Sequence, residues 1–191
     1  MTTPLEAAWE VGLFLTEHGI SYAVIGGLAV QLWGDARLTI DADLTVASSL
    51  TEGSGPFVDL ITQRFPSRIK NPHEFARRNR VVLITASNGI DVDISLGLPG
   101  YEDEMLQRVM NFEWEPGKIV RVCSAEDLII HKSIAGRPQD EIDIQGIVDR
   151  QDDRLDLFYV RSWLKQFAEI LGNPAIENRF EHAWLSYMDK K

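Results

Sequence analysis

The first fifty residues alternate between helical and extended hydrophobic patterns. Apolar residues recur at helical spacing over residues 5–18, and a glycine follows, so we predict a helix there. The apolar run at residues 22–25 predicts a buried strand, and the compact run at residues 28–33 predicts a short helix. Residues 38–46 then alternate strictly between apolar and polar side chains, which is typical of a strand with one buried face.

The middle of the chain has the pattern of one helix followed by a hairpin. A proline near the start of residues 56–65 favours a helix there. Residues 81–86 and 90–96 predict two strands, because Asn88-Gly89 between them is a strong hairpin signal. The second strand repeats the alternation seen before it.

The remaining residues are mainly helical. A helix is predicted over residues 101–110 and a last strand over residues 118–122. Beyond that strand the pattern indicates helices only, at about residues 125–135, 138–150, 155–171 and 174–188. We therefore predict an α/β (α+β) fold, with a helix-flanked sheet in residues 1–122 and a helical part packed on it in residues 123–191.

Composition places the chain among ordinary soluble proteins. It has 191 residues, of which 45% are hydrophobic and 25% charged, enough for one domain with a sizeable core. No stretch approaches the ~20 apolar residues of a membrane span, and the N-terminus lacks the basic start of a signal peptide. We expect a cytoplasmic protein with no membrane partner.

Cysteine and histidine give little support for metal or thiol chemistry. Cys123 is the single cysteine, which excludes an intramolecular disulfide, and we interpret it as a small buried residue rather than a catalytic thiol. The four histidines are scattered without HExxH spacing, so zinc chemistry is not expected.

The net charge of −10 argues against an extended interface with nucleic-acid phosphates. One segment, residues 64–80, is strongly basic, with six Lys or Arg residues against a single Glu. It is either a solvated surface or a patch for a polyanionic substrate.

Four aspartates form the most informative pattern in the sequence. Asp41 and Asp43 share the polar face of one predicted strand, and Asp91 and Asp93 share that of another. Aspartate is depleted in strands, and like charges repel at this spacing of roughly 7 Å. Two such pairs suggest a cation between them, and Mg²⁺ prefers carboxylate oxygens. The alternative is a solvated polar face without an ion.

Gly26 and Gly27 separate a predicted strand from a predicted helix. Glycines at this position let a phosphate approach the backbone at the helix N-terminus, although a tight turn would also use them. The chain has neither a GxGxxG nor a GxxxxGK[ST] motif around them, which excludes dinucleotide-binding and P-loop interpretations.

Two polar positions stand out in the helical part. Lys132 ends an apolar stripe on its predicted helix, so its amine either reaches water or meets an anion. Asp140 and Asp143 follow Pro138 in the first turn of the next helix, where the helix dipole alone would favour them.

The segments IGGLAVQLWGDARLTIDADL and DVDISL together resemble the signature of the DNA polymerase beta-like nucleotidyltransferase superfamily. Within it, GG-x-A, R-x-T-x-D-x-D and the later K...GRPQD are most similar to the AbiEii/AbiGii toxin-like minimal nucleotidyltransferases. The resemblance covers about residues 20–150 and implies a small mixed nucleotidyltransferase-type sheet. Residues beyond 150 carry no motif that it matches.

The resemblance implies a metal-dependent active site. Asp41 and Asp43 would bind one or two Mg²⁺ or Mn²⁺ ions, and a carboxylate of the later strand would complete the site. The family pattern favours Asp93 over Asp91 for that third position, although both face the same way. The resemblance also counts Lys132 among the catalytic residues.

The resemblance likewise implies a site for the substrate NTP, with the triphosphate on the two glycines. Arg37 and Thr39 would touch phosphate or brace the loop, and Asp140, beside Arg137, matches an acidic residue counted in the family's active site. The implied nucleotide-binding residues are Gly26, Gly27, Arg37, Thr39, Lys132 and Asp140.

We therefore expect transfer of an NMP group from an NTP to an acceptor hydroxyl. The resemblance favours RNA such as a tRNA end, whereas the acidic composition of the chain fits a protein hydroxyl better. The resemblance also implies a toxin restrained by an antitoxin partner. The alternatives are a small-molecule (antibiotic-type) nucleotidyltransferase, a catalytically silent nucleotide-binding or protein-interaction module of the same fold, and a metal-dependent phosphoesterase, which the Gly-Gly turn disfavours.

Overall fold

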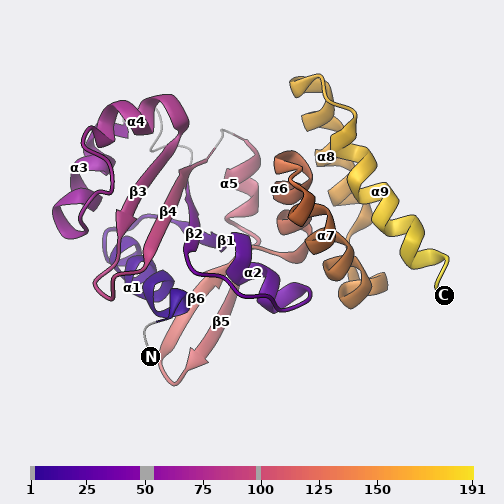
Figure 1. Cartoon of the computed structure of the whole chain (residues 1–191), viewed down its shortest axis with the longest axis horizontal. Helices are drawn as coiled ribbons and strands as arrows, with labels where there is room; N and C mark the ends of the chain where they lie inside the picture. The colour runs from indigo at the N-terminus through magenta and orange to yellow at the C-terminus, as the bar shows by residue number, and fades with distance from the viewer. Residues whose placement is uncertain (1–2, 48–53, 98–99) are drawn as a thin grey trace. The chain divides into compact units, whose positions relative to one another are not determined.

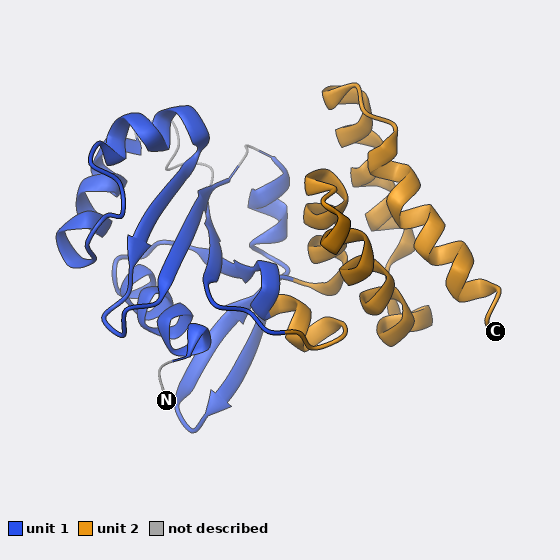
Figure 2. Ribbon diagram, viewed as in Figure 1, with its two compact units in different colours: residues 1–28, 38–123 blue, residues 29–37, 124–191 orange. Residues whose placement is uncertain are grey.

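The computed structural model describes residues 3–47, 54–97 and 100–191 of the chain (Figure 1). It divides into two compact units (Figure 2). Unit 1 comprises residues 1–28 and 38–123, and unit 2 comprises residues 29–37 and 124–191.

Unit 1 is built on a six-stranded mixed sheet, which confirms the predicted fold class. The strands are β1 Tyr22–Ile25, β2 Ala42–Val46, β3 Val81–Thr85, β4 Asp91–Leu96, β5 Met110–Glu115 and β6 Lys118–Val122. Their order across the sheet is β3-β4-β2-β1-β6-β5. The pairs β2–β4 and β1–β6 are parallel, and the other neighbours are antiparallel.

Unit 1 also contains helices. They are α1 Pro4–Glu17, α3 Ser54–Arg64, α4 Pro72–Asn79 and α5 Tyr101–Met105, together with the start of α2 Gly26–Trp33. Of these, α1 and α4 contact strands of the sheet. Helix α1 begins where the Thr3 hydroxyl accepts a hydrogen bond from the Glu6 backbone N–H, and it packs against β1, β2, β4 and β6 (Figure 1).

Unit 2 is helical. It contains α6 Ala125–Ala135, α7 Pro138–Gln151, the short 3₁₀ helix η2 Asp152–Arg154, α8 Leu157–Leu171 and α9 Ala175–Met188. Ser124 caps the start of α6, and Gly136 ends it in the left-handed conformation, as expected for a C-terminal glycine. The end of α2 also belongs to this unit, because the Trp33 and Gly34 carbonyls accept hydrogen bonds from Gln151 and Arg150 of α7.

Two sequence-based predictions of local structure are wrong. The strand predicted over residues 38–46 begins only at Ala42, and Leu38 and Ile40 are 86% and 75% exposed. The helix predicted over residues 101–110 ends at Met105, and residues 110–115 form the edge strand β5. The alternation of Met110, Phe112 and Trp114 with polar residues is a strand signal that the longer helix concealed.

The other predicted helices and strands are present with small shifts of their ends. The hairpin of β3 and β4 turns at Asn88-Gly89 as predicted, with Gly89 at a φ of +81°. Cys123 is fully buried, in agreement with its interpretation as a small core residue.

Candidate active site

Asp43 and Asp93 lie on adjacent strands of unit 1, and Asp41 lies just before one of them. Asp43 of β2 and Asp93 of β4 are direct partners in the parallel register, so their side chains leave the same face of the sheet. Asp41 immediately precedes β2. Its charge acts on Asp93, which places it near that carboxyl group.

Asp43 also lies against the start of helix α2. Its partner in β1 is Ile25, and the chain turns into the helix at the next residue, Gly26. Gly26 has a φ of +62°, and a β-carbon there would come within 2.0 Å of the Asp43 Oδ2 atom. A glycine is therefore required twice at this position, for its backbone conformation and for the space that the carboxylate occupies.

Thr39 has a bracing role next to these carboxylates. Its hydroxyl lies 3.1 Å from Asp41 Oδ1 and 3.3 Å from the Asp41 carbonyl oxygen, and it can donate to either. This contact holds Asp41 in the irregular segment before β2. A contact of Thr39 with phosphate stays a prediction.

Arg68 was not among the predicted site residues, yet it contacts two of the aspartates. Its Nη1 atom lies 3.2 Å from Asp91 Oδ2, and its Nη2 atom donates to Asp93 Oδ1. Burial raises the pKa of Asp93, and the Asp41 and Asp91 charges add to this, while the Arg68 charge and hydrogen bond oppose it. Arg68 is included in the basic segment at residues 64–80, but nothing in the sequence indicated that it would contact Asp91 and Asp93.

The side chains at this point of unit 1 are of the kind that binds a divalent cation. Carboxylate oxygens are the ligands that Mg²⁺ prefers, and the paired register of Asp43 and Asp93 beside Gly26 brings them to one point of the sheet. Within the described ranges, however, no group of three or more His, Cys, Asp or Glu side chains already has the geometry to hold a metal ion.

Unit 2 contains a separate buried ion cluster around Lys132. The Lys132 side chain is 3% exposed, and its ammonium lies 3.0 Å from Asp140 and 2.7 Å from Asp143. The alternative in which this amine reaches water is therefore wrong, because it meets anions of its own chain. The helix dipole alone likewise does not explain why Asp140 is in the first turn of α7, because its side chain is 1% exposed and pairs with Lys132.

Two arginines complete the Lys132 cluster. Arg37 donates to both oxygens of Asp143, at 3.0 and 3.1 Å, and Arg137 donates to Asp140 at 2.8 Å through its side chain. Arg37 therefore braces its own segment, and its predicted contact with phosphate stays untested. Three cations surround two carboxylates, and Arg137 is 73% exposed, so the outer side of the cluster carries positive charge.

The pKa values of both aspartates in this cluster reflect these contacts. Burial acts to raise the pKa of Asp140, but hydrogen bonds from Arg137 and Lys132 outweigh it, and the pKa is lowered. Burial also acts to raise the pKa of Asp143, but hydrogen bonds from Arg37, Lys132 and Gln139 outweigh it, and this pKa is lowered as well. Both side chains are held as carboxylates.

The basic segment at residues 64–80 directs most of its charge to its own chain. Besides Arg68, Arg64 pairs with Glu10 at 2.8 Å and Arg78 with Glu74 at 3.4 Å. Arg80 donates to the Leu96 and Gly97 carbonyl oxygens. The exposed cations that remain, Lys70 and Arg77, make a much smaller patch than the sequence suggested.

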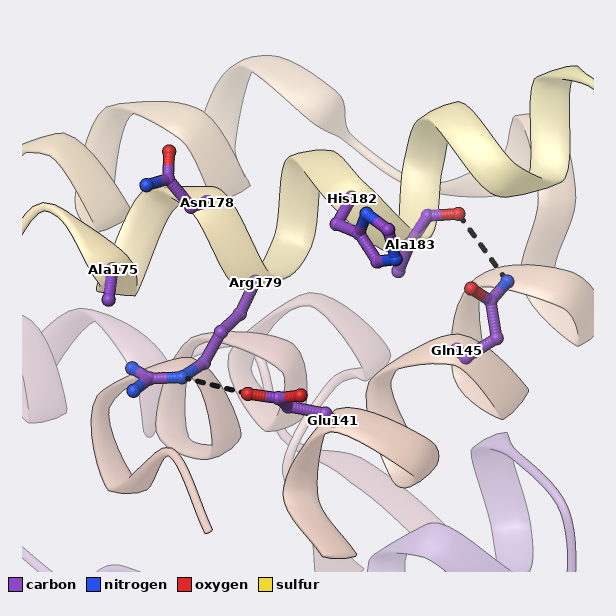
Figure 3. Close-up of a pocket in the computed structure, with 7 residues that line it drawn as sticks. All are labelled: Glu141, Gln145, Ala175, Asn178, Arg179, His182 and Ala183. Carbon is purple, nitrogen blue, oxygen red and sulfur yellow. Dashed lines mark hydrogen bonds and ion pairs between the residues drawn. The ribbon is translucent and has the colours of Figure 1, made fainter. Parts of the chain in front are cut away.

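A separate pocket of about 350 Å³ lies between helices α7 and α9 of unit 2 (Figure 3). Figure 3 shows Arg179 pointing toward Glu141, with 3.6 Å between its Nε and the nearer carboxylate oxygen. Arg179 also donates to the Ser133 carbonyl oxygen at 2.7 Å, near the end of α6. None of the predicted site residues lines this pocket. Arg179 connects helix α9 to α7 through Glu141 and to α6 through Ser133.

No helix in residues 3–47, 54–97 or 100–191 combines the length and apolar character needed to cross a membrane. No family model matches the chain, and no curated protein matches it by sequence.

Solved structures of other proteins are similar to this chain. An antigenic nucleotidyltransferase-like protein from Paracoccidioides brasiliensis has a TM-score of 0.51 at 17% sequence identity, over 93% of this chain and 91% of that chain. The antibiotic-resistance factor ANT(2'')-Ia has a TM-score of 0.42 at 14% identity, over 97% of this chain and 92% of that chain. The first of these similarities shows that this chain has a nucleotidyltransferase-like fold.

Proposed function

We propose that this protein transfers a nucleotidyl group from an NTP to an acceptor hydroxyl in a metal-dependent reaction. One observation carries the proposal: Asp43 and Asp93 are partners on adjacent parallel strands, and Asp43 occupies the space that Gly26 leaves at the start of α2. On a nucleotidyltransferase-like fold, this arrangement brings carboxylates next to a helix N-terminus that can accept phosphate.

Asp41, Asp43 and Asp93 would hold Mg²⁺ or Mn²⁺, with Asp91 as the alternative to Asp93. Such an ion, when bound, stabilises the negative charge that develops on the attacking and leaving oxygens of an in-line displacement. The register favours Asp93 over Asp91 as the third ligand, because Asp93 is the direct neighbour of Asp43.

The protein's own groups would position the reactants and accept a proton. Backbone N–H groups at the start of α2, with Gly26 and Gly27, would bind the triphosphate. The acceptor oxygen would attack the α-phosphorus, the bond to pyrophosphate would break, and the hydroxyl proton would pass to Asp93.

We propose for Lys132 and Asp140 the nucleotide-binding role that their motif implies. Lys132 already has two carboxylate partners, so we expect it to act mainly by holding Asp140 and Asp143 in place. The exposed Arg137 and half-buried Arg37 are then the members of this cluster best suited to meet a phosphate.

Three classes of acceptor are candidates for this reaction. A tRNA end and a protein hydroxyl are the leading candidates for the acceptor, and a small molecule is the third. With either of the first two acceptors, the protein would act as a toxin that an antitoxin restrains. Because most arginines of residues 64–80 pair within the chain, a long RNA backbone has little exposed positive charge to contact there. A short RNA end, a protein or a small molecule fits better.

The acceptor can be identified with each of the four α-³²P-labelled NTPs, Mg²⁺ and three separate fractions: total RNA, total protein and small molecules. We expect label in one fraction, and we expect EDTA and Asp41→Asn to abolish it. Asp59→Asn is the matched control, because Asp59 is an exposed carboxylate paired with His73. Absence of label in every fraction would favour a catalytically silent module.

The toxin proposal needs its own experiment. Induced expression of the wild type should arrest growth of a bacterial host, whereas Asp43→Asn at the same protein level should not. Normal growth with the wild type, alongside label transfer in vitro, would leave the transferase and remove the toxin.

A further inference from the structure

We propose that Arg68 is an internal counter-ion that occupies the metal site in the metal-free protein and gives up Asp93 when a divalent cation binds. This inference rests on the proposed function, because it concerns the same carboxylates. It assigns a role to a residue of the basic segment that the proposed reaction does not use.

Arg68 donates to the same Asp93 carboxylate that a cation shared with Asp43 would use. Its guanidinium donates to one oxygen of Asp91 and one of Asp93, and Asp93 is the register partner of Asp43. A carboxylate oxygen uses its lone pairs both to coordinate a metal ion and to accept a hydrogen bond. An Asp93 carboxylate turned toward Arg68 is therefore a poorer ligand for a cation shared with Asp43.

Charge gives the reason for the contact. Asp91 and Asp93 point to the same side of β4, and Asp41 and Asp43 lie on the neighbouring chain segment. Arg68 offsets part of this repulsion, since its charge acts on Asp93 against those of Asp41 and Asp91. A divalent cation would offset more of it, so the guanidinium is needed only while the cation is absent.

The backbone around Arg68 allows its side chain to leave without unfolding the segment. Ser67 forms an isolated antiparallel bridge with Ile84 of β3, and the Arg68 N–H donates to the Leu83 carbonyl oxygen at 3.0 Å. The Thr85 N–H donates to the Pro66 carbonyl oxygen at the same distance. These bonds hold the main chain on the edge of the sheet whatever the guanidinium contacts.

Exposure is consistent with an exchangeable contact. The Arg68 side chain is 27% exposed, and those of Asp91 and Asp93 are 50% and 37% exposed. Ion pairs this open to water contribute little net stability, so a cation that binds two or more carboxylates can displace one of them.

The test is a titration of purified protein with Mn²⁺ in the absence of NTP, with free Mn²⁺ followed by electron paramagnetic resonance. At low ionic strength Arg68→Ala should bind Mn²⁺ at least about threefold more tightly than the wild type, because a competing charge next to the ion has been removed. Arg78→Ala removes the same charge from an exposed pair with Glu74 and should leave the affinity unchanged.

Arg68→Lys and Arg68→Gln guard against misfolding of the alanine variant. The lysine keeps the charge and should stay near the wild-type affinity, and the glutamine should bind as tightly as the alanine. An unchanged or weaker Mn²⁺ affinity in the folded Arg68→Ala and Arg68→Gln variants would overturn the proposal, since the arginine would then be neutral or would orient Asp93 for the metal.

Asp43→Asn separates this inference from the proposed function. If Asp43→Asn abolishes Mn²⁺ binding while Arg68→Ala binds no more tightly than the wild type, only the counter-ion role fails. If Asp43→Asn binds Mn²⁺ as the wild type does, the metal site itself is wrong and both proposals fall. We expect Asp43→Asn to lose the binding and Arg68→Ala to strengthen it.

Discussion

A β-carbon on Gly26 would lie 2.0 Å from the Oδ2 atom of Asp43. The turn into helix α2 and the candidate metal-binding carboxylate thus occupy neighbouring positions only because residue 26 has no side chain. This relationship brings the two glycines and the Asp41/Asp43 pair together in space, whereas in the sequence they are separated by more than a dozen residues.

Gly26→Ala should therefore impair both folding and the carboxylate site. A non-glycine residue in the left-handed conformation costs about 1–3 kcal/mol, and the new β-carbon must also displace Asp43. Urea unfolding measures the first effect and Mn²⁺ titration the second.

Gly89→Ala is the matched control for this variant. Gly89 also has a positive φ, +81°, but nothing lies within 4 Å of a β-carbon placed there. It should lose stability from backbone strain alone and keep the Mn²⁺ affinity of the wild type. Equal Mn²⁺ affinities in the two variants would mean that Asp43 does not need the space at Gly26.

Lys132→Met should destabilise the protein by about 2–3 kcal/mol. Breaking a buried ion pair costs about 3–5 kcal/mol when a charge is left alone, but here Arg137 and Arg37 still neutralise the two carboxylates. Lys165→Met changes an exposed lysine and should stay within about 0.5 kcal/mol of the wild type. Equal free energies of unfolding for both variants would show that the Lys132 contacts contribute nothing.

Acidification should weaken the fold through His131 before it affects the Lys132 cluster. Burial, and then the charge of Lys132, lower the pKa of His131 from 6.5 to about 4. The unfolded chain therefore takes up a proton that the folded chain refuses, and stability falls as the pH drops from 6.5 to about 4. The midpoint of urea unfolding should fall less over this range in His131→Gln than in the wild type.

The lowered pKa values of Asp140 and Asp143 act in a different pH range. Their contribution is fully present above the unfolded value of about 4 and is lost as the pH falls through their lower folded values. A His131→Gln variant that loses stability between pH 6.5 and 4 as steeply as the wild type would contradict the assignment to His131.

The chain before β2 should tolerate changes that β2 itself does not. Leu38→Ser should change the free energy of unfolding by less than about 0.5 kcal/mol, because Leu38 is exposed. Leu44→Ala in the strand should cost about 2–5 kcal/mol, because Leu44 is fully buried. A large loss of stability in Leu38→Ser would restore the longer strand predicted from the sequence.

The sequence identified most elements because local signals coincide there with the tertiary structure. Helix α6 has the predicted bounds, since Ser124 caps its start and Gly136 ends it. The alternation over residues 38–46 predicted too long a strand, because the exposed Leu38 and Ile40 continue the pattern of β2 outside the sheet. Periodicity reports side-chain order along the chain and does not show where pairing with a neighbouring strand stops.

The candidate site was predictable as a set of residue types and not as a set of contacts. The four aspartates and two glycines were visible in the sequence, but the pairing of Asp43 with Asp93 depends on β2 and β4 being neighbours. The Arg68 contact depends on a loop that pairs with the edge of β3. Long-range pairing of this kind leaves no periodic trace in a single sequence.

Transfer of α-³²P label from NTP, summed over RNA, protein and small-molecule acceptors, tests the central claim most directly when the wild type, Asp43→Asn and Asp59→Asn are compared at equal concentration with Mg²⁺. We predict equal transfer by the wild type and Asp59→Asn, and at least about a 100-fold lower rate for Asp43→Asn, which corresponds to about 2.7 kcal/mol of lost transition-state stabilisation. A wild-type rate in Asp43→Asn, or no transfer by any of the three proteins, would contradict the account.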